Sequence, residues 1–198
     1  MSLLDTKESK LASFLFHGQL AQVSIDDFFK SVSQYDELSF DSVSAKVNIN
    51  LLNERLVESA RKMSAVYIAI ASFENSIRAL ISDRMLEQKG EKWWDSQSVS
   101  ADIRKRAQRK IEEEKQNRWH GPRGLSPIYF TELKDLTHII SSNWDTFEDL
   151  LGDIDWVRHC IKSIERSRNV IMHSGELSME DIQRVGVIIR DWLRQVGE

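Results

Sequence analysis

The residues best suited to chemistry lie in one segment of the chain, from Glu165 to Gly175. Four residues separate Arg168 from His173, and Asn169 directly follows the arginine. A guanidinium can hold a phosphate through two hydrogen bonds, and an imidazole, whose ordinary pKa is about 6.5, can accept and donate protons near neutral pH. At about 100° per residue on a helix, Glu165, Asn169 and His173 form one polar ridge beside Arg168. An arginine, an amide and an imidazole are therefore expected together near a helix end.

Arg168 occupies a position that the periodicity assigns to the packing face of its helix. The apolar residues along this face are Val157, Ile161, Ile164, Ile171 and Met172. A guanidinium buried there without a partner would be costly, so it requires a carboxylate, a phosphate ligand or a subunit interface. A carboxylate is available at Glu74, which falls within the apolar stripe of another predicted helix.

A purely structural interpretation fits the same residues. Arg168 and Glu74 could form an ion pair that only stabilises the fold, and His173 with Gly175 could simply end the helix. An arginine and a histidine at this spacing also occur together by chance, so spacing alone does not establish a catalytic site.

Helical periodicity dominates the chain and predicts an all-α fold, since both prolines, Pro122 and Pro127, lie within one break. The central element is a long helix over 51–88 that ends at Gly90. Its apolar stripe comprises Leu56, Ala60, Met63, Tyr67, Ile70, Ile77, Ile81 and Met85. Other helices are expected near 5–18, from 24, and at 100–118, 128–141, 144–151, 154–172 and from 178 to the C-terminus.

Residues 36–50 are the exception to this helical pattern. Val43, Ala45, Val47 and Ile49 alternate with polar residues, which is the period of a half-buried strand, so an extended segment is predicted. Residues 1–50 are interpreted as an N-terminal extension with accessory helices, and residues 51–198 as one helical domain with a long central helix.

The composition excludes several classes of protein. The 198 residues carry a formal net charge of −4, which argues against a protein that coats nucleic acid through bulk positive charge. Cys160 is the single cysteine and the N-terminus has no secretory leader pattern, so we expect a cytoplasmic protein. The longest charge-free apolar stretch, 63–73, is well short of the roughly 18 residues needed to cross a bilayer. CxxC, HExxH, GxSxG and glycine-rich phosphate-loop motifs are lacking, so these metal, hydrolase and nucleotide sites are not expected.

The segment from Arg168 to His173 resembles the hallmark of the HEPN superfamily, an arginine and a polar residue followed a few residues later by a histidine. Residues 73–78, the Trp93-Trp94 pair, residues 129–133 and the Asn143-Trp144 pair also resemble one HEPN branch. That branch is attached to RNA-surveillance endonucleases and is found in stand-alone bacterial proteins. The resemblance covers roughly residues 50–196.

The resemblance implies an all-α HEPN-like bundle that acts as an endoribonuclease, without a metal or other cofactor, in a homodimer whose two motifs face each other. It implies catalytic roles for Arg168, His173 and Asn169, and supporting roles for Glu74 and Glu165. RNA cleavage without a metal needs a base for the 2′-OH, an acid for the leaving 5′ oxygen and a cation against the charge on phosphorus. The expected product would end in a 2′,3′-cyclic phosphate.

A basic cluster on the 100–118 helix, which includes Arg104, Lys105 and Arg109, could guide RNA to the motif. Its plainer interpretation is a solvated helix face, because acidic residues follow it. The resemblance also implies a toxin or anti-phage defence setting, with an antitoxin or regulatory protein as a further partner. Some HEPN toxins are silenced by AMP transfer to a tyrosine two residues after the histidine, but Gly175 stands there in this chain, so that regulation is not expected.

Two other functions are compatible with the sequence. One is a catalytically silent HEPN-type module that binds RNA or protein, with Arg168 and His173 kept as interface residues. The other is a purely structural helical dimer or antitoxin, in which His173 contributes only to stability.

Overall fold

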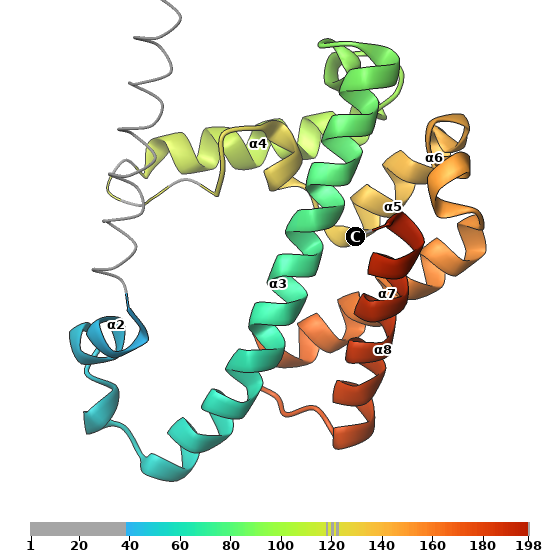
Figure 1. The fold of residues 1–198 in the computed structure, drawn as a ribbon. Coiled ribbons are helices and arrows are strands. Elements are labelled where there is room, and N and C mark those ends of the chain that lie inside the picture. The colour runs from blue at the N-terminus through green and yellow to red at the C-terminus, as the bar shows by residue number, and fades with distance from the viewer. Residues whose placement is uncertain (1–38, 118, 120, 122, 198) are drawn as a thin grey trace, which may run out of the picture. The chain divides into compact units, whose positions relative to one another are not determined.

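The computed structural model describes residues 39–117, 119, 121 and 123–197 (Figure 1). The helices predicted near 5–18 and from 24 lie outside these residues. The chain divides between Val57 and Glu58 into two units, which are described separately below. Every regular element in the described ranges is a helix, so the all-α prediction is confirmed.

The first unit contains a short helix where the sequence predicted an extended segment. The α2 helix spans Phe40–Lys46, and a 3₁₀ helix follows at Ile49–Leu51. The Oγ of Ser39 accepts a hydrogen bond from the backbone N–H of Ser42 and caps the start of α2. A half-buried strand would bury every second residue on one face, but no residue of α2 is buried. The extended prediction for these residues is therefore wrong.

The α3 helix, Glu54–Lys89, is the long helix that the periodicity predicted. Gly90 ends it in the left-handed conformation, at φ +80°, and its N–H bonds to the carbonyl oxygen of Leu86. The buried stripe of α3 runs from Met63 to Met85, whereas Leu56 and Tyr67, which were assigned to this stripe, are exposed. The predicted stripe was thus wrong at Leu56, beyond its N-terminal end, and at Tyr67, which lies beside the buried face.

The other elements of the second unit surround this stripe (Figure 1). They are a 3₁₀ turn at Trp93–Asp95, α4 at Ala101–Gln116, a 3₁₀ turn η3 at Pro127–Phe130, α5 at Leu133–Ser142, α6 at Trp144–Leu151, α7 at Ile154–Met172 and α8 at Met179–Val196. The predicted 128–141 helix is divided into η3 and α5. Glu132 begins α5, and its backbone N–H bonds to the carboxylate of Asp135.

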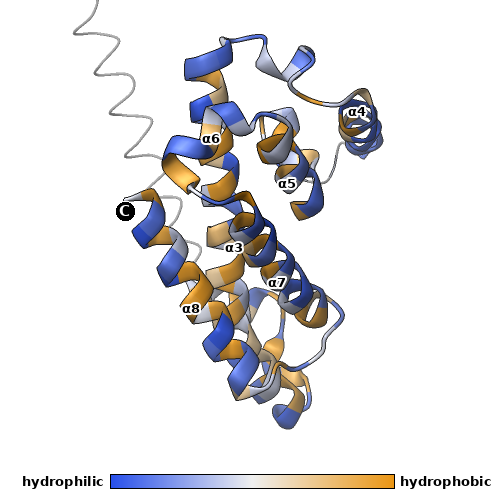
Figure 2. Cartoon of the chain, turned by 90° about the vertical axis from the view of Figure 1, so that its right-hand side faces the viewer, coloured by the Kyte–Doolittle hydropathy of each residue, from blue (hydrophilic) through white to orange (hydrophobic). Residues whose placement is uncertain are grey.

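Helices α7 and α8 lie along α3 and pack against each other (Figures 1 and 2). Apolar and polar residues alternate along both helices with helical periodicity, as Figure 2 shows, so each presents one apolar side to the core. Trp192 of α8 contacts Phe73 of α3 edge-on at 5.4 Å between ring centroids and stacks on Trp156 of α7 at 5.6 Å. This aromatic cluster helps to fix the position of α7, which carries the Arg-x4-His motif, relative to α3.

Two side-chain caps set the ends of the helices around the motif. The Asp153 carboxylate accepts the N–H groups of Asp155 and Trp156 at the start of α7. The Ser178 hydroxyl accepts the N–H of Asp181 at the start of α8, as the sequence predicted. The caps leave residues 173–177 as a short connection between the two helices.

No helix within the described ranges combines the length and the apolar character that crossing a membrane requires. Cys160 is buried on α7, and its burial raises the pKa of the thiol to about 11.

We expect Ile77→Ala to lower the free energy of unfolding by about 2–5 kcal/mol, because it opens a cavity in a packed core. Ile77 is fully buried on α3. The matched control is Ile68→Ala, an exposed isoleucine of the same helix, which should change the value by less than about 0.5 kcal/mol. Urea denaturation measures both, and equal losses would contradict the assigned buried face of α3.

Candidate active site

The centre of the site is the buried carboxylate of Glu74, which lies between two guanidinium groups. Oε1 of Glu74 is 2.5 Å from Nη2 of Arg78, and Oε2 is 3.0 Å from Nε of Arg168. The side chains of Glu74 and Arg78 are only 9% and 8% exposed, whereas that of Arg168 is 37% exposed. The carboxylate that the sequence offered as a partner for Arg168 is therefore in contact with it.

Arg78 falls within the segment 73–78 that resembles the HEPN branch, and no role was predicted for it. Its guanidinium donates to the carbonyl oxygens of Ile128 and Thr131, at 3.4 and 3.2 Å, and lies over the ring of Tyr129 at 5.9 Å. It thus binds η3 to α3 through backbone acceptors. The sequence does contain a signal for this role. Glu74 and Arg78 are four residues apart inside an apolar stripe, which is the spacing of an ion pair on one helix face.

A polar cavity of about 620 Å³ opens beside Arg168. Residues from α3, α4, α5, α7 and the segment 123–132 line it. Its cationic lining residues are Arg78, Lys110, Arg123, Lys134 and Arg168, and its acidic ones are Glu74, Glu132 and Glu165. Positive side chains therefore predominate locally, although the whole chain is negative.

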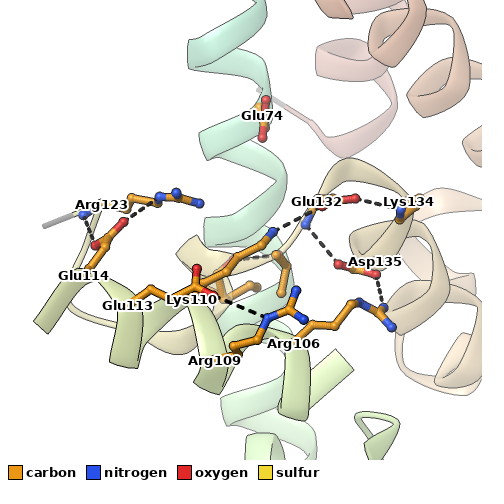
Figure 3. Close-up of polar contacts among 12 residues, drawn as sticks. Glu74, Arg106, Arg109, Lys110, Glu113, Glu114, Arg123, Glu132, Lys134 and Asp135 are labelled. Atoms are coloured by element: carbon orange, nitrogen blue, oxygen red, sulfur yellow. Dashed lines mark hydrogen bonds and ion pairs between the residues drawn. The ribbon is translucent and has the colours of Figure 1, made fainter. Parts of the chain in front are cut away.

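Glu132 organises the part of this cavity formed by α4 and α5. Its carboxylate lies 3.2 Å from the Nζ of Lys110 and 2.7 Å from the Nζ of Lys134 (Figure 3). Hydrogen bonds from these ammonium groups lower the pKa of Glu132 to about 2. A neighbouring pair, Arg106 with the buried Asp135 at 2.6 Å, also joins α4 to α5.

The structure separates the residues of the predicted motif into two environments. Arg168, Asn169 and Glu165 line the polar cavity, whereas His173 does not. His173 is the exposed C-cap residue of α7, and its backbone N–H bonds to the carbonyl oxygen of Asn169. Its imidazole therefore lies at the end of the helix, outside the cavity that holds the arginine.

A tight turn sets the path of the chain directly after His173. The N–H of Gly175 bonds to the carbonyl oxygen of Val170 at 2.8 Å, and Ser174 adopts a positive φ of 60°. A Cβ on Gly175 would come within 2.8 Å of the Val170 side chain and 2.9 Å of its carbonyl oxygen. Glycine at position 175 thus allows the close approach that ends α7.

The predicted RNA-binding residues of α4 lie outside the cavity. Arg104 donates to the carbonyl oxygen of Ser96, Lys105 is exposed, and Arg109 is 3.6 Å from Glu113 of the same helix. The neighbouring Lys110 lines the cavity instead. Lys134, which also lines it, begins another helix and carried no signal in the sequence that linked it to this cluster.

Comparison with protein families matches residues 69–197 to the family described as Swt1-like HEPN. The match spans the larger part of the chain and includes Glu74, the polar cavity and the Arg-x4-His motif. The chain belongs to the Swt1-like HEPN family, as the resemblance predicted at the level of the superfamily. Comparisons with curated proteins and with solved structures found no match. Family membership indicates, in general terms, a role as an RNase or in RNA binding.

We expect Glu74→Gln to lower the free energy of unfolding by about 3 kcal/mol, because it leaves the buried Arg78 guanidinium without a counter-charge. The control is Glu87→Gln, which removes an exposed carboxylate 3.7 Å from Arg84 on the same helix. This control should cost less than about 0.5 kcal/mol in urea denaturation. An equally small loss for Glu74→Gln would contradict a buried ion pair that holds the site together.

Glu132 should make the stability of the protein depend on pH in the acidic range. Because its pKa falls from the ordinary 4.5 to about 2 on folding, its stabilising effect is complete above about pH 4.5 and is lost as the pH falls towards 2. Solvent screening of this exposed pair limits the effect to about 1 kcal/mol. In thermal unfolding across this range, Glu132→Gln should abolish this part of the pH dependence, and removal of its lysine partners should reduce it. If Glu132→Gln has the same pH profile as the wild type, Glu132 is not the group that causes this acid dependence.

Proposed function

We propose that this protein is a metal-independent endoribonuclease that cleaves RNA through Arg168 and His173 at the interface of a homodimer. The supporting observation is the state of Arg168. Its Nε lies 3.0 Å from Oε2 of the buried Glu74, while the arginine side chain is 37% exposed. A half-exposed guanidinium fixed from behind in this way is preorganised to bind a phosphate through two hydrogen bonds.

The reaction follows from the groups that the motif supplies. A base removes the proton of the RNA 2′-OH, and the 2′ oxygen attacks the adjacent phosphorus. The bond from phosphorus to the 5′ oxygen breaks, and an acid protonates that oxygen. The products are a 2′,3′-cyclic phosphate and a 5′-hydroxyl. Arg168 balances the charge that develops on phosphorus, His173 transfers protons, and Asn169 orients the phosphate beside Arg168.

The homodimer is proposed because the motif of one chain contains a single histidine, whereas the reaction needs both a base and an acid. A second copy would supply the second imidazole. Met172 and Tyr67 are exposed apolar side chains that line a small pocket together with Arg168. Apolar residues at this position suit a contact between two copies. The mass of the protein in solution tests this expectation.

A toxin or anti-phage defence role, with an antitoxin or regulatory protein as partner, is part of the same proposal. Its support is the resemblance to stand-alone bacterial HEPN proteins. Such a protein would act on RNA in the cytoplasm, and host growth should be impaired by the wild type but not by a His173 variant.

A second candidate is a catalytically silent HEPN-type dimer that binds RNA or protein. One observation favours it: His173 lies outside the polar cavity that contains Arg168 and Asn169. In this case the cavity would hold RNA, and no proton transfer would follow.

The test is cleavage of labelled RNA in EDTA by the wild type, Arg168→Ala and His173→Ala. We expect each variant to lose at least about 100-fold in rate, because a general acid or base and an electrostatic donor each contribute about this much or more. The wild-type products should end in cyclic phosphate, and DNA of the same sequence should stay intact because it lacks the 2′-OH.

Matched controls are Arg166→Ala and His159→Ala, which remove an exposed arginine and an exposed histidine from the same helix. Both should keep the wild-type rate. If the folded wild type binds RNA but leaves it uncut, the silent binding module replaces the nuclease as the proposed function.

A further inference from the structure

The two lysines that line the polar cavity come from different helices and share one counter-ion. Lys110 extends from α4 and Lys134 from the first turn of α5, and both reach Glu132. Figure 3 shows these contacts side by side, with Lys110 and Lys134 approaching Glu132 from two directions. One carboxylate thus holds two ammonium groups at the edge of the cavity.

This pair of lysines lies in the same cavity as the phosphate-binding end of the motif. Arg168 and Asn169 line the cavity from α7, and Lys110 and Lys134 line it from α4 and α5. The volume of about 620 Å³ falls within the range of about 300–1,000 Å³ that is typical of ligand pockets. A chain of phosphates that reaches Arg168 has room to pass the lysines within this cavity.

We propose that Lys110 and Lys134 form a second phosphate-binding subsite of the same RNA site, in which phosphates of the RNA chain replace Glu132 as the partner of the two lysines. This inference rests on the proposed function for its ligand, a single-stranded RNA. It assigns the binding of the RNA backbone to the cavity and not to the outer face of α4.

The proposed subsite works by exchange of anions: an RNA phosphate takes the place of the Glu132 carboxylate beside the two lysines. Glu132 and Lys134 are 46% and 63% exposed, and exposed ion pairs contribute little to stability, so this pair exchanges partners readily. Lys110 is 21% exposed and keeps its position at the cavity when Glu132 is displaced. Glu132 stays ionised near neutral pH even without its lysine partners, since the ordinary pKa of a glutamate is about 4.5. It therefore competes with every incoming phosphate, and the subsite favours a polyanion that is also anchored at Arg168 over an isolated phosphate ion.

On the outer face of α4 the basic side chains do not meet at one point, as Lys110 and Lys134 do at Glu132. Arg104 is bound to a backbone carbonyl oxygen, and Arg109 points to an acidic residue of its own helix. Neither residue lines the cavity that Arg168 and Asn169 line. RNA binding in the cavity and RNA binding on the outer face of α4 therefore predict different effects of substitutions on the measured affinity.

The experiment measures binding of a fluorescent 2′-O-methyl RNA of about 12 nucleotides, a length within the usual range of single-strand sites. The RNA cannot be cleaved, so binding is measured independently of catalysis. Fluorescence anisotropy at several salt concentrations gives Kd and the slope of log K against log salt. Each lost phosphate contact on a single strand should reduce this slope by about 0.7.

We expect Lys110→Ala and Lys134→Ala each to weaken binding and to reduce the salt slope by about 0.7, and the double variant by about 1.4. Glu132→Gln should lower Kd several-fold, because it removes the competing anion and leaves both lysines in place. The matched control is Lys162→Ala, an exposed lysine of α7 outside the cavity, which should bind as the wild type does. Thermal unfolding verifies that each variant is folded. Lys134→Ala should be folded in any case, because the Lys134 side chain is 63% exposed.

Two outcomes would overturn the inference. In one, Lys105→Ala or Arg109→Ala reduces the slope while Lys110→Ala and Lys134→Ala do not, which would place the RNA backbone on the outer face of α4. In the other, the wild type does not bind RNA at all, which would indicate another partner for the cavity, such as an acidic protein. Failure of the nuclease proposal is distinguishable from both, because the subsite stands if these slopes change while cleavage is absent.

Discussion

The ion pair network of Glu74 is the constraint on which the rest of the site depends. A carboxylate that is 9% exposed requires compensation, and two guanidinium groups provide it from different elements. Arg78 lies on the same helix and carries the contact onward to the backbone of η3, while Arg168 arrives from α7. One buried charge therefore joins α3, α7 and η3. The same charge fixes the direction of Arg168, which is the more exposed of the two arginines. Stability and the placement of the motif are consequences of the same contact.

The cavity beside Arg168 repeats this arrangement at higher exposure. Glu132 pairs with Lys110 and Lys134 as Glu74 pairs with its two arginines, but the Glu132 carboxylate is 46% exposed, whereas that of Glu74 is 9% exposed. The difference in burial decides what each cluster can do. The buried network is costly to break and therefore holds a position, whereas the exposed one exchanges partners at little cost and can therefore receive a ligand. A chain with a net negative charge thus presents a local concentration of positive charge in the cavity beside Arg168.

Membership of the Swt1-like HEPN family relates this charge distribution to RNA. Whether RNA is bound or cut depends on proton transfer, and the relevant imidazole lies at the exposed end of α7. Arg168, five residues or about 1.4 helical turns earlier, lines the cavity, while His173 is exposed to solvent. In the proposed homodimer, contact through the ends of α7 would bring two imidazoles together beside two arginines held by Glu74. Under that proposal each chain would supply a phosphate site, and the pairing of two chains would supply the acid and the base.

Local signals in the sequence determined the helical class, the long α3 helix with its end at Gly90, the cap of α8 at Ser178 and the need of Arg168 for a carboxylate. Each of these follows from residues within a few turns of one another, or from the cost of a charge on an apolar face. The α2 helix follows from another local contact, the Ser39 cap, although its residues alternate like a strand. Tertiary structure alone decided that Leu56 and Tyr67 of the predicted α3 stripe are exposed. It also decided that Lys110, and not its neighbour Arg109, faces the cavity, and that Lys134 joins it from another helix. Periodicity ranks the faces of one helix, but which face becomes covered depends on elements that are distant in the sequence.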